Sequence, residues 1–163
     1  MSSKFRIVEH LVPCQHIREY AQATANEQED VLHLAVKQYI PLDNPDPKPG
    51  DITIIGGHAN GFVKVCDVLH DLQRAAYAIQ ELYEPLWEEM LLRFEECGIG
   101  LRGIWIADAA QQGQSGIVNE HLLGNDPCWN DHSRDLLGLI NLKRKDMPRP
   151  IIGVGHSMGG NNL

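Results

Sequence analysis

The chain has 163 residues, of which 43% are hydrophobic and 22% are charged, and this composition is typical of one soluble globular domain. Its formal net charge of -8 argues against nucleic acid or an anionic membrane surface as a partner, because both require clustered lysine and arginine. No stretch approaches ~18 uninterrupted apolar residues, so the sequence predicts no membrane span.

The cysteines and the chain ends predict no metal centre, disulfide framework or targeting signal. The four cysteines are far apart and form no CxxC pair and no Cys/His zinc spacing. Residues 1–13 hold no apolar run of the length that a secretory signal needs, which favours reduced thiols in an intracellular compartment. The final residues, Asn161-Asn162-Leu163, are not a peroxisomal address of the Ser-Lys-Leu type.

The first part of the chain predicts strands. "FRIVEHLVP" (5–13) is a weak strand pattern, and "DVLHLAVKQYIP" (30–41) combines alternation with β-branched residues. The proline- and aspartate-rich "LDNPDPKPGD" (42–51) predicts a surface loop. Residues 52–55, in "DITIIGGHANGF", then predict a short buried strand that ends in two glycines.

The second part alternates helix patterns with apolar strands. A helix from residue 81 to a capping glycine at 98 would align apolar side chains at a spacing of four: Leu82, Leu86, Met90 and Phe94. A second helix with Asp131 as its N-cap would present a stripe of Leu136, Leu137 and Ile140. Buried strands are expected in "LRGIWIADAA" (101–110) and "PIIGVGHS" (150–157).

This alternation of strands and helices predicts right-handed βαβ units and an α/β fold with a mostly parallel sheet and flanking helices. In such sheets, the chemistry lies at the carboxyl ends of the strands. His58, Asp108 and Ser157 each follow an expected strand. Asp108 is interpreted as a carboxylate that orders its own loop rather than a catalytic group.

Ser157 stands in a G-x-S-x-G pattern between a strand and an expected helix. Its glycines, Gly155 and Gly159, suit a nucleophile elbow, because side chains beside so tight a turn would collide with neighbouring chain. The N–H of Met158 would then face a developing oxyanion. A second donor is expected in "GGHANGF", where Ala59 or Asn60 is placed to supply it.

"HANGF", "D…GQS" and "GHSMGG", in this order, resemble the α/β-hydrolase family, and the resemblance covers nearly the whole chain. "VPCQHIREY", "DVLHLAVKQYIPLDNP" and "ELYEPLW" are similar to fungal α/β-hydrolases of polyketide host-selective toxin biosynthesis. The resemblance implies that residues 1–163 form the N-terminal part of one α/β-hydrolase domain. It also implies that Ser157 is the nucleophile and that Met158 and Ala59 form the oxyanion hole.

The resemblance further implies a hydrolase of esters or thioesters with a small acyl or polyketide-derived substrate, and it implies no metal or organic cofactor. Members of the group are linked to peroxisomes, which makes the peroxisome the expected location and the cytoplasm the alternative.

The chain departs from the family after the serine, where the triad acid and histidine are expected in the order Ser…Asp/Glu…His. Only residues 158–163 follow, and every histidine precedes or flanks the elbow. We therefore hypothesise an incomplete α/β-hydrolase fold, truncated just after the elbow and catalytically inactive. The alternatives are a non-catalytic remnant, a small-molecule binding module, or a fragment completed by a second polypeptide. Strand 151–155 would be an open edge prone to self-association.

A second departure lies in "VKVCDVLHDLQRAAYAIQ". Removing Val65 to Gln80 leaves "HANGFVKELYEPLWEEM", which is closer to the family pattern. Valine-cysteine can be encoded GTATGT and glutamine CAG, as at the ends of a short fungal intron, so we hypothesise a retained intron at 65–80. The alternative is a genuine amphipathic helix, and transcript sequencing distinguishes the two.

Overall fold

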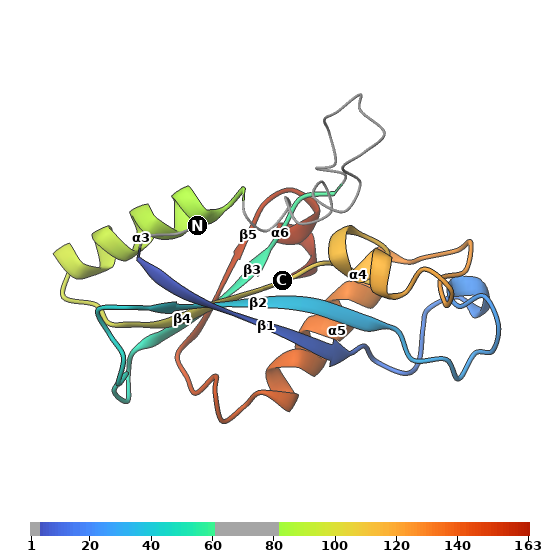
Figure 1. Cartoon of the computed structure of the whole chain (residues 1–163), viewed down its shortest axis with the longest axis horizontal. Helices are drawn as coiled ribbons and strands as arrows, with labels where there is room; N and C mark the ends of the chain where they lie inside the picture. Colours follow the sequence, from blue (N-terminus) through green and yellow to red (C-terminus); the bar gives the residue numbers. More distant parts are fainter. Residues whose placement is uncertain (1–3, 61–81) are drawn as a thin grey trace.

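A computed structural model describes residues 4–60 and 82–163 of the chain, and segment 65–80, with its two interpretations, lies outside them. Five strands form one sheet in the order β1-β2-β4-β3-β5 (Figure 1). The strands are β1 (Phe5–Pro13), β2 (His33–Pro41), β3 (Ile52–Gly57), β4 (Leu101–Ala107) and β5 (Ile151–Gly155). The helical elements are η1 (Ala21–Ala23), α3 (Glu84–Glu96), α4 (Gly113–Val118), α5 (Trp129–Leu142) and α6 (Met158–Asn162).

The sheet is mixed. Strand β3 pairs in parallel with β4 on one side and with β5 on the other. Strand β2 pairs antiparallel with both β1 and β4. The parallel pairing predicted from the βαβ alternation is therefore confined to β4, β3 and β5, where the connections contain α3 and α5; the loop-connected β1 and β2 add the antiparallel part.

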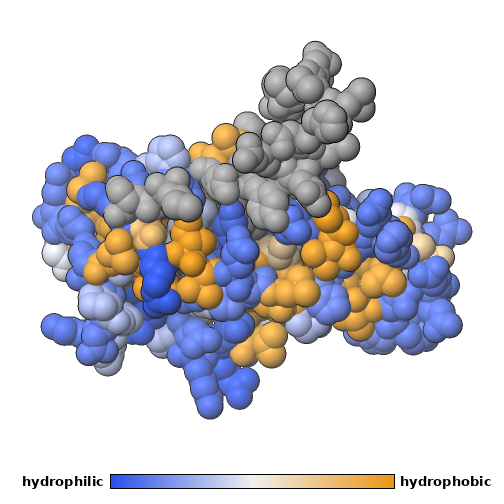
Figure 2. Space-filling model, in the orientation of Figure 1, coloured by the Kyte–Doolittle hydropathy of each residue, from blue (hydrophilic) through white to orange (hydrophobic). Residues whose placement is uncertain are grey.

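Helices cover both faces of the sheet, so successive residues of the central strands pack into different cores (Figure 1). On the face that carries α3, the buried cluster is Phe5, Tyr39, Ile54, Trp87, Leu91, Leu101, Ile104 and Ile106. On the face that carries α5, Ile55 and Trp105 pack with residues such as Leu136 and Leu139. The predicted buried strands β3 and β4 are confirmed. In the space-filling view, polar side chains cover much of the visible face, with apolar side chains between them (Figure 2).

Helix α3 is rotated relative to the predicted stripe. Trp87 and Leu91 are its buried residues, whereas Leu82 and Leu86, expected to be buried, are 55% and 43% exposed. The indole of Trp87 explains the rotation, because it lies where a Cβ on Gly56 of β3 would come within 3.2 Å of its Cζ2 atom. The absence of a side chain at that position makes room for the largest ring of the helix. Gly98, with φ of 68°, ends the helix as predicted.

Three details of helix α5 and strand β5 differ from the prediction. Asp131 is a buried residue of the first turn rather than the N-cap, which is Cys128, and Leu137 is 59% exposed. Strand β5 lies at the edge of the sheet, as expected for an open edge, so Ile152 is 41% exposed and the strand is not buried as its apolar run predicts. Self-association through this edge stays a prediction, which sedimentation of the wild type and of Ile152→Lys would test.

Candidate active site

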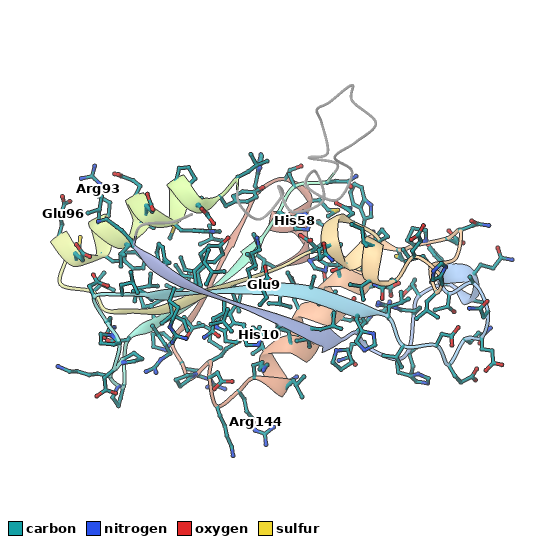
Figure 3. The ribbon with its side chains drawn as sticks, viewed as in Figure 1. Glu9, His10, His58, Arg93, Glu96 and Arg144 are labelled. Carbon is teal, nitrogen blue, oxygen red and sulfur yellow. The ribbon has the colours of Figure 1, made fainter. Side chains whose placement is uncertain are left out.

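The three residues expected at strand ends lie at one edge of the sheet. His58 follows β3, Asp108 follows β4 and Ser157 follows β5 by one residue; these three strands are parallel neighbours. Figure 3 shows His58 beyond the end of β3. Its Nε2 atom lies 3.9 Å from Oδ1 of Asp108.

Ser157 occupies a strained turn between β5 and α6. Its φ of 55° and ψ of −118° make it the one non-glycine residue with positive φ in the described part of the chain. Such a conformation costs of order 1–3 kcal/mol and persists only where the surrounding structure enforces it. Ser157 is exposed, whereas the next residue, Met158, is buried.

Glycines enforce the turn by letting two backbone segments touch. A Cβ on Gly57 would lie 2.6 Å from the carbonyl oxygen of Gly159, and a Cβ on Gly159 would collide with the carbonyl group of Gly57. A Cβ on Gly155 would lie 2.5 Å from Cα of Gly160. The N–H of His156 also donates to the carbonyl of Gly57 at 2.9 Å. The serine turn is thus fixed directly against the end of β3.

The candidate oxyanion donors differ in their surroundings. Met158 is the first residue of α6, so its N–H has no acceptor within the helix. The N–H of Ala59 donates to the hydroxyl of Tyr83 at 3.1 Å. The side-chain oxygen of Asn60 accepts a 2.7 Å hydrogen bond from Gln112. Ala59 is buried and Asn60 is exposed.

His58 anchors this loop and is not placed as a base. Its Nε2 atom accepts the N–H of Ala109 at 3.3 Å, so its Nδ1 atom carries the proton and donates to the carbonyl of Ala59 at 2.9 Å. The ring is fully buried. Asp108 accepts the N–H of Gln114 at 2.8 Å, close to the start of α4, which agrees with a loop-ordering role.

The ring of His156 is engaged with Tyr83, since its Nδ1 atom lies 3.1 Å from the hydroxyl of that residue. Within residues 4–60 and 82–163, no side chain is hydrogen-bonded to the Ser157 hydroxyl. A serine hydroxyl without a base in reach is a poor nucleophile.

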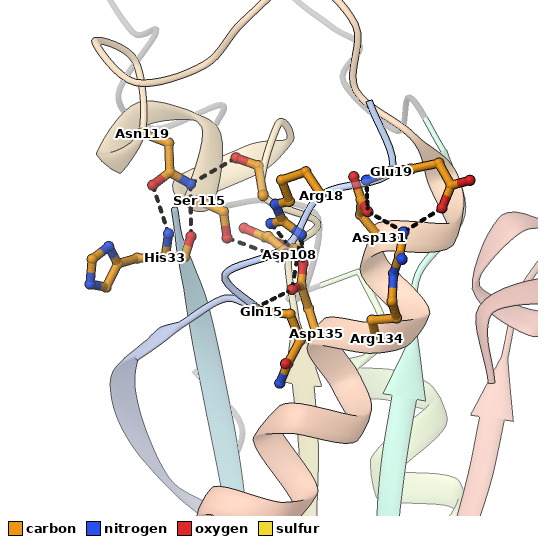
Figure 4. A network of polar contacts seen from close by, with 11 residues as sticks. Gln15, Arg18, Glu19, His33, Asp108, Ser115, Asn119, Asp131, Arg134 and Asp135 are labelled. Atoms are coloured by element: carbon orange, nitrogen blue, oxygen red, sulfur yellow. Dashed lines mark hydrogen bonds and ion pairs between the residues drawn. The ribbon is translucent and has the colours of Figure 1, made fainter. Parts of the chain in front are cut away.

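A buried polar network holds the segment after β1 against α5, near the same edge of the sheet (Figure 4). Arg18 forms a bidentate ion pair with Asp135 at 3.0 Å, and the N–H of Gln15 donates to the same carboxylate at 2.8 Å. One turn earlier, Asp131 accepts the N–H of Glu19 at 3.0 Å. Burial raises the pKa of Asp135 to about 6, against the opposing effect of Arg18.

The same network continues through α4. The hydroxyl of Ser115 accepts the N–H of Ala35 and donates to the carbonyl of Asp108 at 2.9 Å. The Asn119 side chain exchanges hydrogen bonds of 2.8 Å with the backbone of His33. These bonds attach the loop after β4 to the start of β2, and so fix the position of Asp108.

His132 is a buried residue of α5 that the sequence does not single out. Among the described residues, neither of its ring nitrogens has a hydrogen-bond partner, and its ring centroid lies 6.1 Å from that of His58. Burial lowers the pKa of His132 to about 3. Tyr83 and Gln112, which bind the loop after β3, were also missed, because no local sequence pattern marks a contact made across the fold.

Within the described ranges, no cluster of three or more His, Cys, Asp or Glu side chains is arranged to hold a metal ion. In the same ranges, no helix has both the length and the apolar character needed to cross a membrane.

No protein-family model matches the chain. Over 161 residues, it is 49% identical to the type I acyl-CoA thioesterase mpaH' of Penicillium brevicompactum and 48% identical to the type I acyl-CoA thioesterase mpaH of Penicillium roqueforti. Each match covers 98% of this chain and 33% of the relative, so the chain spans about a third of the length of these relatives.

Among solved structures, the peroxisomal α/β-hydrolase Lpx1 of Saccharomyces cerevisiae matches 98% of this chain and 39% of its own, with a TM-score of 0.67 and 20% sequence identity. At that identity the match shows the fold alone, and the fold agrees with the mixed sheet and the strand-end site described above. By sequence the chain is similar to type I acyl-CoA thioesterases, and by fold it is similar to a peroxisomal α/β-hydrolase.

Proposed function

We propose that the chain supplies the nucleophile and the oxyanion donors of a serine hydrolase that cleaves small acyl thioesters. Ser157 is the nucleophile, and the N–H groups of Met158 and Ala59 are the donors. The strained φ of 55° at Ser157, held by the contact between Gly57 and Gly159, is the observation that carries the proposal, because a nucleophile elbow requires a strained serine between a strand and a helix. The thioesterase names of the relatives support the thioester as substrate.

In the proposed reaction, Oγ of Ser157 attacks the acyl carbon and its proton passes to a base. The carbonyl oxygen becomes an oxyanion that accepts hydrogen bonds from Met158 and Ala59. Collapse breaks the carbon–sulfur bond, the thiol leaves with a proton, and an acyl-serine ester remains. Water then attacks the ester and releases the carboxylic acid. These reaction steps need no metal or organic cofactor.

The base is the part that the described residues do not provide. His58 uses both ring nitrogens in backbone hydrogen bonds, and His156 is engaged with Tyr83. We therefore expect slow turnover from the 163-residue chain alone. This same observation favours the second candidate function, a module that binds an acyl ligand at the strand-end site without hydrolysing it.

Chemical rescue separates the two functions. Hydrolysis of a short acyl-CoA is followed by thiol release at increasing concentrations of imidazole, which can replace an absent histidine. Ser157→Ala is the matched control and reports the background reaction of imidazole itself. The hydrolase proposal predicts that the wild type exceeds Ser157→Ala by a margin that grows with imidazole. Equal rates at every concentration, together with saturable binding of acyl-CoA, would establish the binding module.

The proposal extends to the cellular role. The substrate is a polyketide-derived acyl thioester of fungal metabolite biosynthesis, with host-selective toxin assembly as the specific case implied by the resemblance. The corresponding location is the peroxisome, with the cytoplasm as the alternative. Fluorescence microscopy of a tagged chain in its host, with a peroxisomal marker, distinguishes the two.

A further inference from the structure

Tyr83 connects three segments that meet at the proposed site. Its hydroxyl accepts the N–H of Ala59 at 3.1 Å, and it lies 3.1 Å from Nδ1 of His156, the neighbour of Ser157. Its ring stacks on Trp87, with centroids 5.9 Å apart and planes inclined by 27°. Trp87 is buried in the core beneath α3. The ring of Tyr83 is therefore positioned by Trp87, and its hydroxyl by Ala59 and His156.

The direction of the hydrogen bonds follows from the chemistry of the donors. The Ala59 N–H can only donate, so the phenol oxygen accepts from it. The phenol proton is then free to point to Nδ1 of His156, which accepts it in the tautomer protonated at Nε2. This arrangement satisfies all three groups in one chain of hydrogen bonds.

The phenol oxygen stands where a substrate oxygen is needed. An oxyanion-hole donor must lie about 2.7–3.1 Å from the developing oxyanion, and Tyr83 holds an oxygen at 3.1 Å from one of the two proposed donors. A single N–H directs a strong hydrogen bond to one acceptor. The acyl oxygen of a substrate and the hydroxyl of Tyr83 therefore compete for the N–H of Ala59.

We propose that the Tyr83 hydroxyl is a built-in occupant of the Ala59 donor, which an incoming acyl oxygen must displace before Ser157 reacts. This inference rests on the proposed function for its consequence, since displacement matters only if Ala59 serves an oxyanion. Its structural half, the occupied donor, stands independently. The chain thus carries a contact that keeps one of the two proposed oxyanion donors occupied until substrate arrives.

Tyr83→Phe tests the occupancy directly, because it removes the hydroxyl and keeps the ring that stacks on Trp87. The first readout is hydrogen exchange of the Ala59 amide, resolved by NMR. Tyr39→Phe is the matched control: it removes a phenol that bonds Glu84, the residue next to Tyr83, at 3.3 Å. The proposal predicts about 10-fold or faster exchange of the Ala59 amide in Tyr83→Phe and no such change in Tyr39→Phe. Equal exchange in the wild type and Tyr83→Phe would overturn it.

The second readout is the rate at which a fluorophosphonate labels Ser157, because its phosphoryl oxygen must enter the oxyanion hole. Removing the competing hydroxyl should speed labelling roughly 3- to 10-fold, the effect of one hydrogen bond. Unchanged or slower labelling in Tyr83→Phe would overturn displacement and assign Tyr83 a supporting role instead. If no variant is labelled, including the wild type with imidazole, the proposed hydrolase fails, and the amide exchange alone decides whether Tyr83 occupies the donor.

Discussion

Two regions at the carboxyl edge of the sheet are held in opposite ways. The segment after β1 is attached to α5 by buried side chains, chiefly the ion pair between Arg18 and Asp135 (Figure 4). The serine turn is attached to β3 by the absence of side chains, through the backbone contact between Gly57 and Gly159. Charged groups fix the first region, and close packing of peptide groups fixes the second.

The difference shows why the proposed chemistry lies on the second region. A backbone contact leaves the Ser157 hydroxyl and the Met158 N–H without a hydrogen-bond partner in the described part of the chain, whereas the polar groups of the network in Figure 4 bind one another. The polar network supports the loop that carries Asp108, because the hydroxyl of Ser115 donates to the carbonyl of that residue. The glycine contact concentrates strain at the residue that is proposed to react.

The largest expected effect comes from breaking the polar region. Arg18→Met leaves the buried carboxylate of Asp135 without its ion partner, which should lower the free energy of unfolding by about 3–5 kcal/mol. The matched control is Arg93→Met, since Arg93 pairs with Glu89 and Glu96 on the exposed surface of α3 and its replacement should change the free energy of unfolding little. Urea unfolding at pH 7 measures the free energy of unfolding of both variants. Similar losses in the two would contradict the claim that the buried ion pair matters more than the exposed one.

Disrupting the backbone contact between Gly57 and Gly159 should lower the free energy of unfolding somewhat less than Arg18→Met does, but it should reduce the reactivity of Ser157 more. Gly159→Ala forces a methyl group into the backbone of Gly57, which cannot move without shifting β3, so a loss of about 2–3 kcal/mol is expected. Gly160→Ala is the control, because its Cβ would lie 3.5 Å from the nearest atom, the carbonyl oxygen of Gly155. Labelling of Ser157 should disappear in the first variant and persist in the second.

The pH dependence of stability sharpens the comparison. The pKa of His132 is about 3 in the folded chain and ordinarily 6.5, so its contribution is complete above about pH 6.5 and is lost as the pH falls, by up to about 1.4 kcal/mol per unit. The pKa of Asp135, raised from 3.8 to about 6, acts oppositely: stability falls as the pH rises between these values.

His132→Leu removes the pH-dependent contribution of His132 and keeps that of Asp135. As the pH falls from 6.5 to 4, the free energy of unfolding of the wild type should therefore fall steadily relative to that of this variant. Urea unfolding across that range measures it. Parallel curves would show that the buried imidazole accepts a proton in the folded state.

The smallest expected effect concerns the strain at the turn. Glycine adopts positive φ without penalty, so Ser157→Gly should raise the free energy of unfolding by about 1 kcal/mol. Ser157→Ala removes the hydroxyl and keeps the strain, and should change stability little. Denaturant unfolding of the two variants distinguishes relief of backbone strain from loss of the hydroxyl. Equal free energies of unfolding for Ser157→Gly and Ser157→Ala would show that the turn is relaxed.

The sequence predicted the features that local pattern determines. Apolar runs located β3 and β4, and the glycines around Ser157 located the turn, because close backbone approach requires glycine at those positions. The antiparallel placement of β1 and β2, the rotation of α3 onto Trp87 and the contact of Tyr83 with Ala59 depend on residues far apart in the chain. Periodicity within one segment carries no information on such contacts.

Peptide mapping by mass spectrometry after exposure of the folded chain to a fluorophosphonate, with imidazole present, tests the central claim most directly. The account predicts one phosphonate adduct, located on Ser157 and absent from Ser157→Ala. An adduct on any other residue, or none at all on a chain whose fold is intact, would contradict it.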